Sequence, residues 1–235
     1  MAVFGTIAFM GNILLAGTGG AFLSELTEEA LAAGSRVAVT ADTAFSARES
    51  VDKDRKKTNL YYIAWNPRSP LSARTLVTEA WNDLENVDEV IVSFFADTGK
   101  KEFHDLAFAD MEKVVDDSIK SYFFLVKEIF TALRGQKKGV LSFAYHDGGV
   151  EVLPPLQAAA AAAFRSFASS LFAQYQNEPF TLYGYYSSLA ETRAFARFLS
   201  RLADTRTEKT ARRWVRFSGK SGLFSFGKNK QGKDS

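Results

Sequence analysis

Short apolar runs alternate with longer segments of helical period along most of the sequence. The runs are rich in β-branched and aromatic residues and fall at 12–17, 35–41, 60–65, 88–96, 139–145, 180–186 and 212–218. Helical spacing of apolar residues marks the segments between them, one ending at about 33 and others covering about 72–84, 110–134, 156–175 and 191–203. Each run is apolar on both sides of a strand, which is typical of a parallel sheet covered by helices on both faces.

Strands that alternate with helices imply right-handed crossovers between parallel strands. The pattern therefore predicts an α/β fold, a Rossmann-like doubly wound parallel sheet of about seven strands. At 235 residues the chain is long enough for one large domain, which we place at 1–221. The remaining residues, 222–235, are basic and linker-like, and we expect a flexible C-terminal tail there.

Cysteine is absent and histidine occurs only at His104 and His146. These counts exclude a disulfide framework, a thiolate metal site and a cysteine nucleophile, so we expect no metal and a cytoplasmic location. The first charged residue is Glu25, yet the opening segment has no basic residues and is interrupted by glycines. We therefore predict a buried strand and a glycine turn there, and neither a signal peptide nor a membrane span.

The first strand runs into the glycines Gly17, Gly19 and Gly20, before the next helix. A glycine-rich turn at this place in a doubly wound sheet can hold a pyrophosphate against backbone N–H groups. A tight turn that needs positive φ explains Gly17 and Gly19 equally well.

Several segments carry a family resemblance. They are the spacing from Gly17 to Gly34, the strand "SRVAVTA", and the stretches "EALAAGSRV" and "FRSFASSLFAQ". With the order of the other elements, they make residues 11–217 resemble the short-chain dehydrogenase/reductase family. The resemblance implies NAD or NADP held by Gly17, Gly19, Gly20 and an acidic residue after the second strand, for which Asp42 is the candidate.

The cofactor motifs of that family are altered in this chain. The second and third glycines of the family's TGxxxGxG pattern fall on Ala21 and Leu23, and leucine should occupy space that the cofactor needs. The ribose-binding acidic position falls on Ala41, so Asp42 comes one residue late and would face the other way in a strand.

The catalytic motifs are altered more strongly. The family's asparagine falls at or next to Ser118, its serine on Ala144 or, with a one-residue shift, on Tyr145, and its Tyr-x-x-x-Lys pair on Gln157 and Ala161. Glutamine cannot exchange a proton near neutral pH and alanine supplies no charge. No lysine occurs between 139 and 199, so a shifted register does not restore the pair.

These substitutions predict a catalytically inactive protein that acts as an interaction, scaffolding or regulatory module without a cofactor. The alternative is a divergent NAD(P)-dependent oxidoreductase in which Tyr145 donates the proton. In that alternative, Tyr145, His146 and Asp147 could form a substitute acid/base set. The segment "YHDGG" that contains them is also explained by a simple turn with no catalytic role.

Two further departures bear on the cleft. Ser187 and Ser188 stand where the family usually has Pro-Gly and a mobile loop, so little of a lid is expected. Aromatic residues at 94–95, 122–124 and 183–186 could line a ligand pocket, but we expect them to fill the volume of the lost cofactor.

The helices at 110–134 and 156–175 correspond to the pair through which members of the family commonly dimerise. Small residues on the second helix permit close approach, and they are Ala158, Ala161, Ala162, Ser166, Ser169 and Ser170. We therefore expect a homodimer and an unidentified protein partner.

Residues 209–235 hold eight Lys/Arg and one acidic residue, Asp234, so the tail can bind nucleic acid or an anionic surface. The alternative is a last strand of the sheet followed by a solvated or partner-docking tail.

Overall fold

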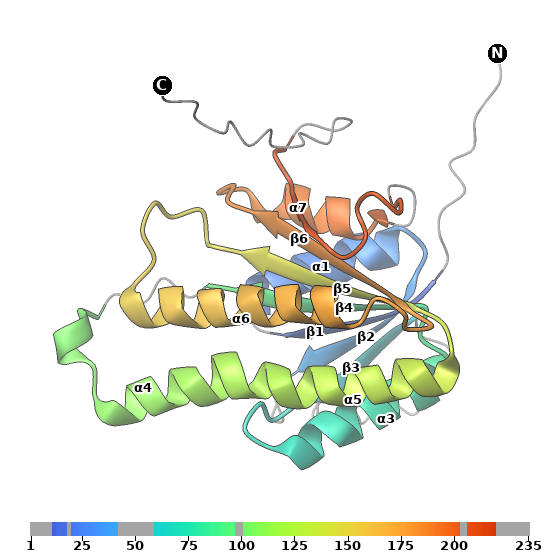
Figure 1. Ribbon diagram of the computed structural model, residues 1–235, viewed down its shortest axis with the longest axis horizontal. Coiled ribbons are helices and arrows are strands. Elements are labelled where there is room, and N and C mark those ends of the chain that lie inside the picture. The colour runs from blue at the N-terminus through green and yellow to red at the C-terminus, as the bar shows by residue number, and fades with distance from the viewer. Residues whose placement is uncertain (1–10, 18–19, 42–58, 97–100, 203–205, 220–235) are drawn as a thin grey trace.

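The computed structural model describes residues 11–17, 20–41, 59–96, 101–202 and 206–219 (Figure 1). Seven parallel strands form one sheet in the order β3-β2-β1-β4-β5-β6-β7, which confirms the predicted doubly wound sheet. The strands are β1 (Asn12–Gly17), β2 (Arg36–Ala41), β3 (Leu60–Ala64), β4 (Glu89–Phe95), β5 (Val140–His146), β6 (Thr181–Ser187) and β7 (Trp214–Arg216).

Helices cover both faces of this sheet (Figure 1). The helices α1 (Gly20–Ala32) and α7 (Thr192–Leu199) pack on one face. The other face carries α3 (Pro70–Leu84), α5 (Ser121–Gln136) and α6 (Pro155–Gln174). A short 3-10 turn, η2 (Phe103–Asp105), and α4 (Phe108–Val115) lead into α5 through the π-helical turn η3 (Asp116–Lys120).

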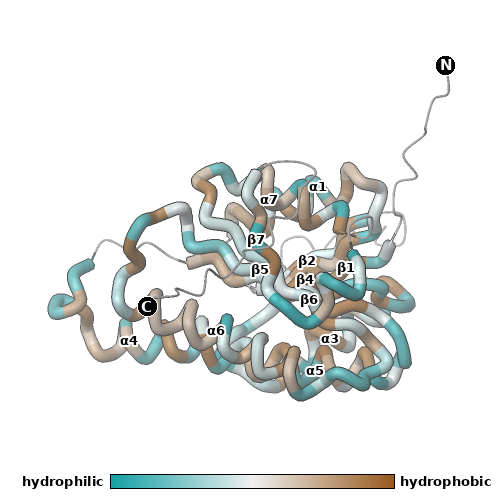
Figure 2. The backbone as a smooth tube through the Cα atoms, turned by 45° about the horizontal axis from the view of Figure 1, so that its top comes forward, coloured by the Kyte–Doolittle hydropathy of each residue, from teal (hydrophilic) through white to brown (hydrophobic). Residues whose placement is uncertain are grey.

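Alternation along each strand divides the core into two layers. In β1, Ile13 and Leu15 belong to the layer under α1 and α7, while Leu14 and Ala16 belong to the layer under α3, α5 and α6. Each fully buried aliphatic or aromatic side chain of this kind contributes about 1.5–3 kcal/mol relative to exposure. The central strands are accordingly among the hydrophobic parts of the chain (Figure 2).

The sequence predicts one uninterrupted helix at about 110–134, and the structure extends it to 108–136 and places a π-turn inside it. A π-turn adds about one residue to a helical turn, so it rotates the residues that follow relative to a regular helix. Asp116 and Asp117 of this turn pair with Lys120 and Arg68, at 2.7 Å and 2.8 Å between nitrogen and oxygen. We call the combined segment, residues 108–136, the long helix.

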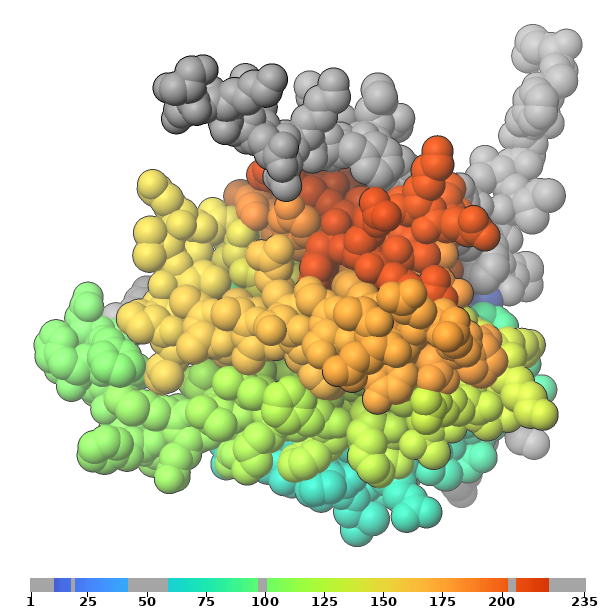
Figure 3. Space-filling view, in the orientation of Figure 1, coloured from blue at the N-terminus to red at the C-terminus, as the bar shows by residue number. Residues whose placement is uncertain are grey.

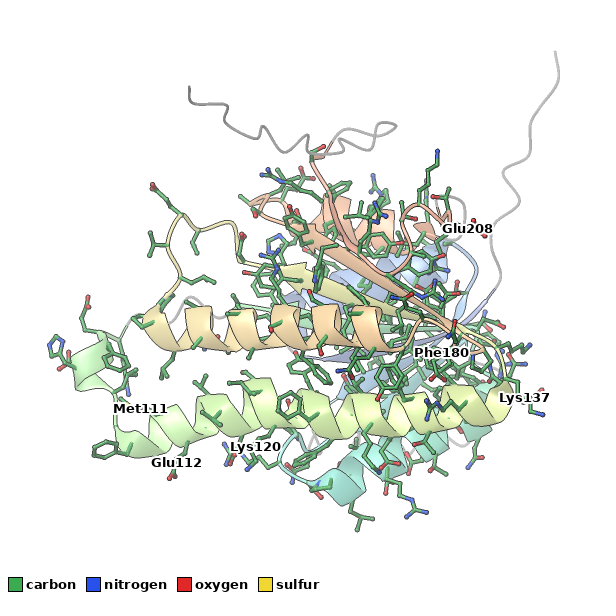
Figure 4. All side chains as sticks on the ribbon, in the orientation of Figure 1. Met111, Glu112, Lys120, Lys137, Phe180 and Glu208 are labelled. Carbon is green, nitrogen blue, oxygen red and sulfur yellow. The ribbon has the colours of Figure 1, made fainter. Side chains whose placement is uncertain are left out.

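The long helix and α6 lie side by side across one face of the molecule (Figure 3). Met111 near its start and Lys137 just past its end lie at opposite ends of the molecule in Figure 4. Several predicted features lie outside the described residues: Gly19, Asp42 and the tail at 222–235.

Candidate functional site

The carboxyl ends of β1 and β4 define the place where a doubly wound sheet receives ligands. These two strands are neighbours, but the chain leaves them in opposite directions, to α1 on one face and towards the long helix on the other. A crevice opens at such a switch point in open α/β sheets. Of the sequence-predicted cofactor residues, Gly17 ends β1 at this edge and Gly20 begins α1.

Gly17 ends β1 with a φ of 143°, a backbone conformation that residues other than glycine rarely adopt. A Cβ atom at this position would lie 1.9 Å from the carbonyl oxygen of Ser93 in β4. Glycine is therefore required for the close approach of β1 to β4, whether or not a phosphate binds. By contrast, a Cβ atom at Gly20, the first residue of α1, would meet nothing within 4 Å.

Four aromatic rings gather at the carboxyl ends of β4 and β5, on the face covered by α1 and α7. They are Phe22, Phe95, His146 and Phe195, and we call them the aromatic cluster. Phe22 stacks on Phe195 with ring centroids 5.7 Å apart, and Phe95 stacks on His146 at 5.0 Å. Leu23, the next residue of α1, is buried in the same core layer. The cluster thus packs four rings against one another at the carboxyl ends of β4 and β5, next to the start of α1.

His146 is fully buried and both of its ring nitrogens are bonded. Nδ1 accepts a hydrogen bond from the Gly148 N–H at 2.9 Å, so Nε2 carries the proton and donates to the Leu189 carbonyl at 2.9 Å. Burial lowers the pKa of His146, which favours this neutral tautomer. His146 therefore ties the β5–α6 connection to the β6–α7 connection and has no free nitrogen for proton transfer.

The segment "YHDGG" forms the turn that the sequence offered as its simpler explanation. Gly148 and Gly149 have φ of 77° and 69°, and the Asp147 carboxylate accepts from the Gly149 N–H at 3.0 Å. Tyr145 and His146 belong to opposite core layers, because neighbouring residues of a strand face opposite ways. The structure consequently does not bring Tyr145, His146 and Asp147 together as an acid/base set.

The two candidate positions for the family's serine also separate. Ala144 lies in the layer under α1 and α7, while Tyr145 lies in the layer under α6, together with Ala161. Gln157, one turn before Ala161 on α6, is half-buried, and Ser118 lies in the π-turn of the long helix. Of the two positions, only Tyr145 shares a core layer with α6.

Tyr145 is 6% exposed, and its hydroxyl has no hydrogen-bond partner among the described residues. Burial raises the pKa of Tyr145, and the nearby Asp147 raises it further. The phenol therefore stays protonated at neutral pH and is a hydrogen-bond donor. In the family that the sequence resembles, a tyrosine that acts as a base has its pKa depressed, which is the opposite direction.

Sequence reasoning missed Arg165, the single charged residue of α6. Its guanidinium carbon lies 5.0 Å, 5.4 Å and 5.7 Å from the ring centroids of Tyr186, Tyr145 and Trp214. The sequence does set this arginine apart, because it is the one charged residue in a 20-residue helix made mostly of alanine, serine and phenylalanine. Only the pairing of β5, β6 and β7 shows which rings surround it.

Ion pairs hold α7 directly on α1. The Glu29 carboxylate accepts from Arg193 Nε and Arg197 Nε, both at 3.1 Å, and the Arg197 guanidinium lowers the pKa of Glu29. Arg193 also reaches Glu28 at 3.1 Å. Only four residues separate β6 from α7, in agreement with the predicted short connection.

None of the helices in the described ranges has both the length and the apolar character needed to cross a bilayer. Within the same ranges, no three His, Asp or Glu side chains come together in a way that could hold a metal ion.

The sheet order, the glycine at the end of β1 and the switch point between β1 and β4 define a Rossmann-type protein. The chain belongs to the short chain dehydrogenase family, whose family model matches residues 12–197. A comparison with curated proteins finds no match.

Solved structures share the fold. A short chain dehydrogenase from Mycobacterium smegmatis superposes with a TM-score of 0.70 at 15% sequence identity, over 91% of this chain and 94% of that one. A hydroxysteroid dehydrogenase from Escherichia coli gives a TM-score of 0.69 at 17% identity, over 89% and 96%. At such identities the similarity establishes the architecture alone.

Proposed function

We propose that this short chain dehydrogenase family protein does not carry out hydride transfer and acts instead as an interaction module, assembled through the long helix and α6. The observation that carries the proposal is the aromatic cluster, whose rings pack together at the ends of β4 and β5 beside the start of α1. Loss of the proton-transfer residues supports it independently.

The sequence resemblance aligns Gln157 and Ala161 with the family's acid/base tyrosine and lysine. Neither side chain can donate or accept a proton near neutral pH, and neither can depress the pKa of a neighbour. Ala161 is also only 4% exposed within the core, so the packing leaves little room for a longer side chain there. Proton transfer by the usual route is therefore absent.

The residues of the described part do not fit a dinucleotide well. Phe22, at the start of α1, contacts both Phe95 and His146 with ring centroids 6.0 Å apart. These rings occupy the side of the edge where a nucleotide would pass between α1 and β4. The pairing of Glu29 with Arg193 and Arg197 keeps α7 close to α1 over the same face.

An exposed apolar stripe runs along the long helix. Phe108, Val115 and Phe123 are 85%, 40% and 44% exposed. The first two are seven residues apart, and the extra residue of the π-turn brings the third, eight residues later, onto the same side. Phe123 also contacts Phe167 of α6 edge to face, with centroids 4.9 Å apart, so the stripe adjoins α6.

The outward side of α6 is smooth and uncharged next to this stripe. Its exposed small residues are Ala158, Ala159, Ala162, Ser166, Ser169, Ser170 and Ala173. Among the predicted small residues, Ala161 is buried and so lies off this surface. Aromatic side chains beside a surface of small residues allow two copies of the helix pair to pack closely. We take a second copy of this chain as the partner on this face.

Sedimentation velocity at micromolar concentration tests the assembly. We expect a dimer, and we expect Phe108→Asp to weaken the association by about tenfold or more, because exposed aromatic side chains at an interface centre carry much of its energy. Leu71→Asp is the matched control, since Leu71 is 71% exposed but belongs to α3 and not to the long helix or α6. A wild-type monomer would contradict the homodimer.

Fluorescence titration with NADH and NADPH tests the loss of cofactor binding. We expect no saturable binding by a well-folded protein. Saturable binding near micromolar affinity would favour the second candidate, a divergent NAD(P)-dependent oxidoreductase. One observation supports that candidate: Tyr145 is buried below α6 with an unpaired hydroxyl and could donate a proton.

A further inference from the structure

Three polar side chains form a row across the carboxyl ends of β5, β6 and β7. In the register of the sheet, Tyr145 pairs with Tyr186, and Tyr186 pairs with Arg216. Paired residues of parallel strands share a face, and Tyr145 and Tyr186 both pack in the layer under α6. The row therefore lies beneath the middle of α6, at the outer part of the sheet.

Arg165 reaches this row from α6. Its guanidinium carbon lies 5.0 Å from the ring centroid of Tyr186 and 5.4 Å from that of Tyr145. The Trp214 ring, on the same face as Arg216 in β7, flanks it at 5.7 Å. Rings on several sides hold a guanidinium in a defined place without using its N–H donors.

The two arginines keep their hydrogen-bonding capacity. Within the described part of the chain, the guanidinium of neither Arg165 nor Arg216 forms a hydrogen bond or an ion pair. Other arginines are neutralised by carboxylates: Arg68 by Asp117, Arg134 by Glu178, Arg193 and Arg197 by Glu29, and Arg206 by Glu89.

The Tyr145 hydroxyl supplies a further hydrogen-bond donor close to Arg165. The residue is 6% exposed, and its hydroxyl has no partner among the described residues. The hydroxyl oxygen is not one of the fully buried polar atoms that lack a partner, so it reaches the surface and can donate to a ligand there. Among the described residues, the one acidic group that influences the Tyr145 pKa is Asp147, whose carboxylate already accepts from the Gly149 N–H.

We propose that Arg165, Arg216, Tyr145 and Tyr186 form a binding site for the oxyanion of a small molecule, either a carboxylate or a phosphate. The planar guanidinium of Arg165 offers parallel N–H donors that match either group, and the phenols supply further donors. The rings of Tyr186 and Trp214 give an apolar wall for the rest of the ligand. This site lies on the face opposite the aromatic cluster and does not depend on dimerisation or on cofactor loss.

Tryptophan fluorescence gives a local readout, because Trp214 contacts Arg165 and the chain has only three tryptophans. Inorganic phosphate and benzoate are titrated at constant ionic strength, which removes general charge screening. We expect a saturable change with at least one of the two. Stronger binding of phosphate assigns phosphoryl ligands, and stronger binding of benzoate assigns carboxylates.

Arg165→Gln is expected to weaken binding by about 10- to 100-fold, the loss that removal of a charge-assisted contact produces. Arg165→Lys keeps the charge but loses the planar fork, and we expect an intermediate effect. Arg74→Gln on α3 is the matched control, an exposed arginine far from β7. Arg216→Gln, on the edge strand, repeats the test should the α6 variant fail to fold.

A response that does not saturate overturns the proposal, and so does equal weakening by Arg74→Gln and Arg165→Gln. Either result would mean that Arg165 only packs on the neighbouring aromatic rings and binds no ligand. The variant Trp214→Phe shows whether the fluorescence change comes from β7. If calorimetry still detects phosphate binding but the fluorescence change is lost, the change arises from Trp214. If the fluorescence change persists in this variant, it arises from another tryptophan, and this result contradicts the proposed site.

Discussion

The imidazole of His146 lies flat on the ring of Phe95, with centroids 5.0 Å apart and planes 4° apart. The two residues end neighbouring strands and are partners in the sheet register. His146 is held there by hydrogen bonds to Gly148 and Leu189. This part of the aromatic cluster is therefore built from the strand ends themselves, and moving His146 away would break both hydrogen bonds.

Restoring the family's pair by Gln157→Tyr with Ala161→Lys is expected to leave NADH binding absent. The aromatic cluster occupies the edge independently of these two positions, and a lysine at the buried Ala161 must lose solvation. Nicotinamide fluorescence measures the result. The matched control places the same residues one position along α6, as Ala158→Tyr with Ala162→Lys; NADH binding by the first variant alone would show that the cluster leaves room for the cofactor.

Stability is expected to fall between about pH 7.5 and about pH 5.5 because of His146. Burial lowers the pKa of His146 below its ordinary value of 6.5, so the unfolded chain takes up the proton first as the pH falls. The stabilisation is fully present above pH 6.5 and is lost below it, at up to about 1.4 kcal/mol per pH unit.

Urea unfolding at the two pH values measures this loss. In His146→Phe the ring contacts remain but the titrating group is gone, so its free energy of unfolding should change less over the same interval. The substitution also leaves the Gly148 N–H and Leu189 carbonyl unpaired, which lowers stability by about 2–4 kcal/mol at either pH. An equal pH dependence of both proteins would assign the effect to other groups.

Glu29→Gln is expected to destabilise the protein by about 1–2 kcal/mol, because Glu29 is the buried centre of two arginine contacts between α1 and α7. Glu28→Gln removes an exposed contact to the same Arg193 and should cost about 0–0.5 kcal/mol. Thermal unfolding of both variants gives the comparison. Similar losses of unfolding free energy in the two variants would mean that burial does not strengthen the ion pairs of Glu29.

The buried pair of Glu89 and Arg206 joins the start of β4 to the segment after α7, and Ser142 donates to the same carboxylate at 2.9 Å. Arg206→Met leaves Glu89 buried without its counter-charge and should cost about 3–5 kcal/mol. The double variant Glu89→Gln with Arg206→Met should be more stable than Arg206→Met alone. Additive losses in a denaturation cycle would contradict this coupling.

The fold could be predicted from the sequence because it depends on local patterns. Apolar runs such as 12–17 and 139–145 are buried on both faces wherever they pair, so their burial needs no knowledge of their neighbours. The prediction that Gln157 and Ala161 occupy the positions of the family's Tyr-x-x-x-Lys pair also rests on residue types and spacing along the chain alone. The π-turn at Asp116–Lys120 was not, because a single inserted residue leaves the helical pattern nearly unchanged.

The sequence by itself determined the order of strands and helices along the chain and placed a glycine, Gly17, at the end of the first strand. Only the tertiary structure decided which face each side chain joined: it put His146 against Phe95 and Phe22, and Tyr145 against Arg165. The physical reason is that these contacts join strands and helices distant in the chain, and a one-residue step along β5 changes the partner completely.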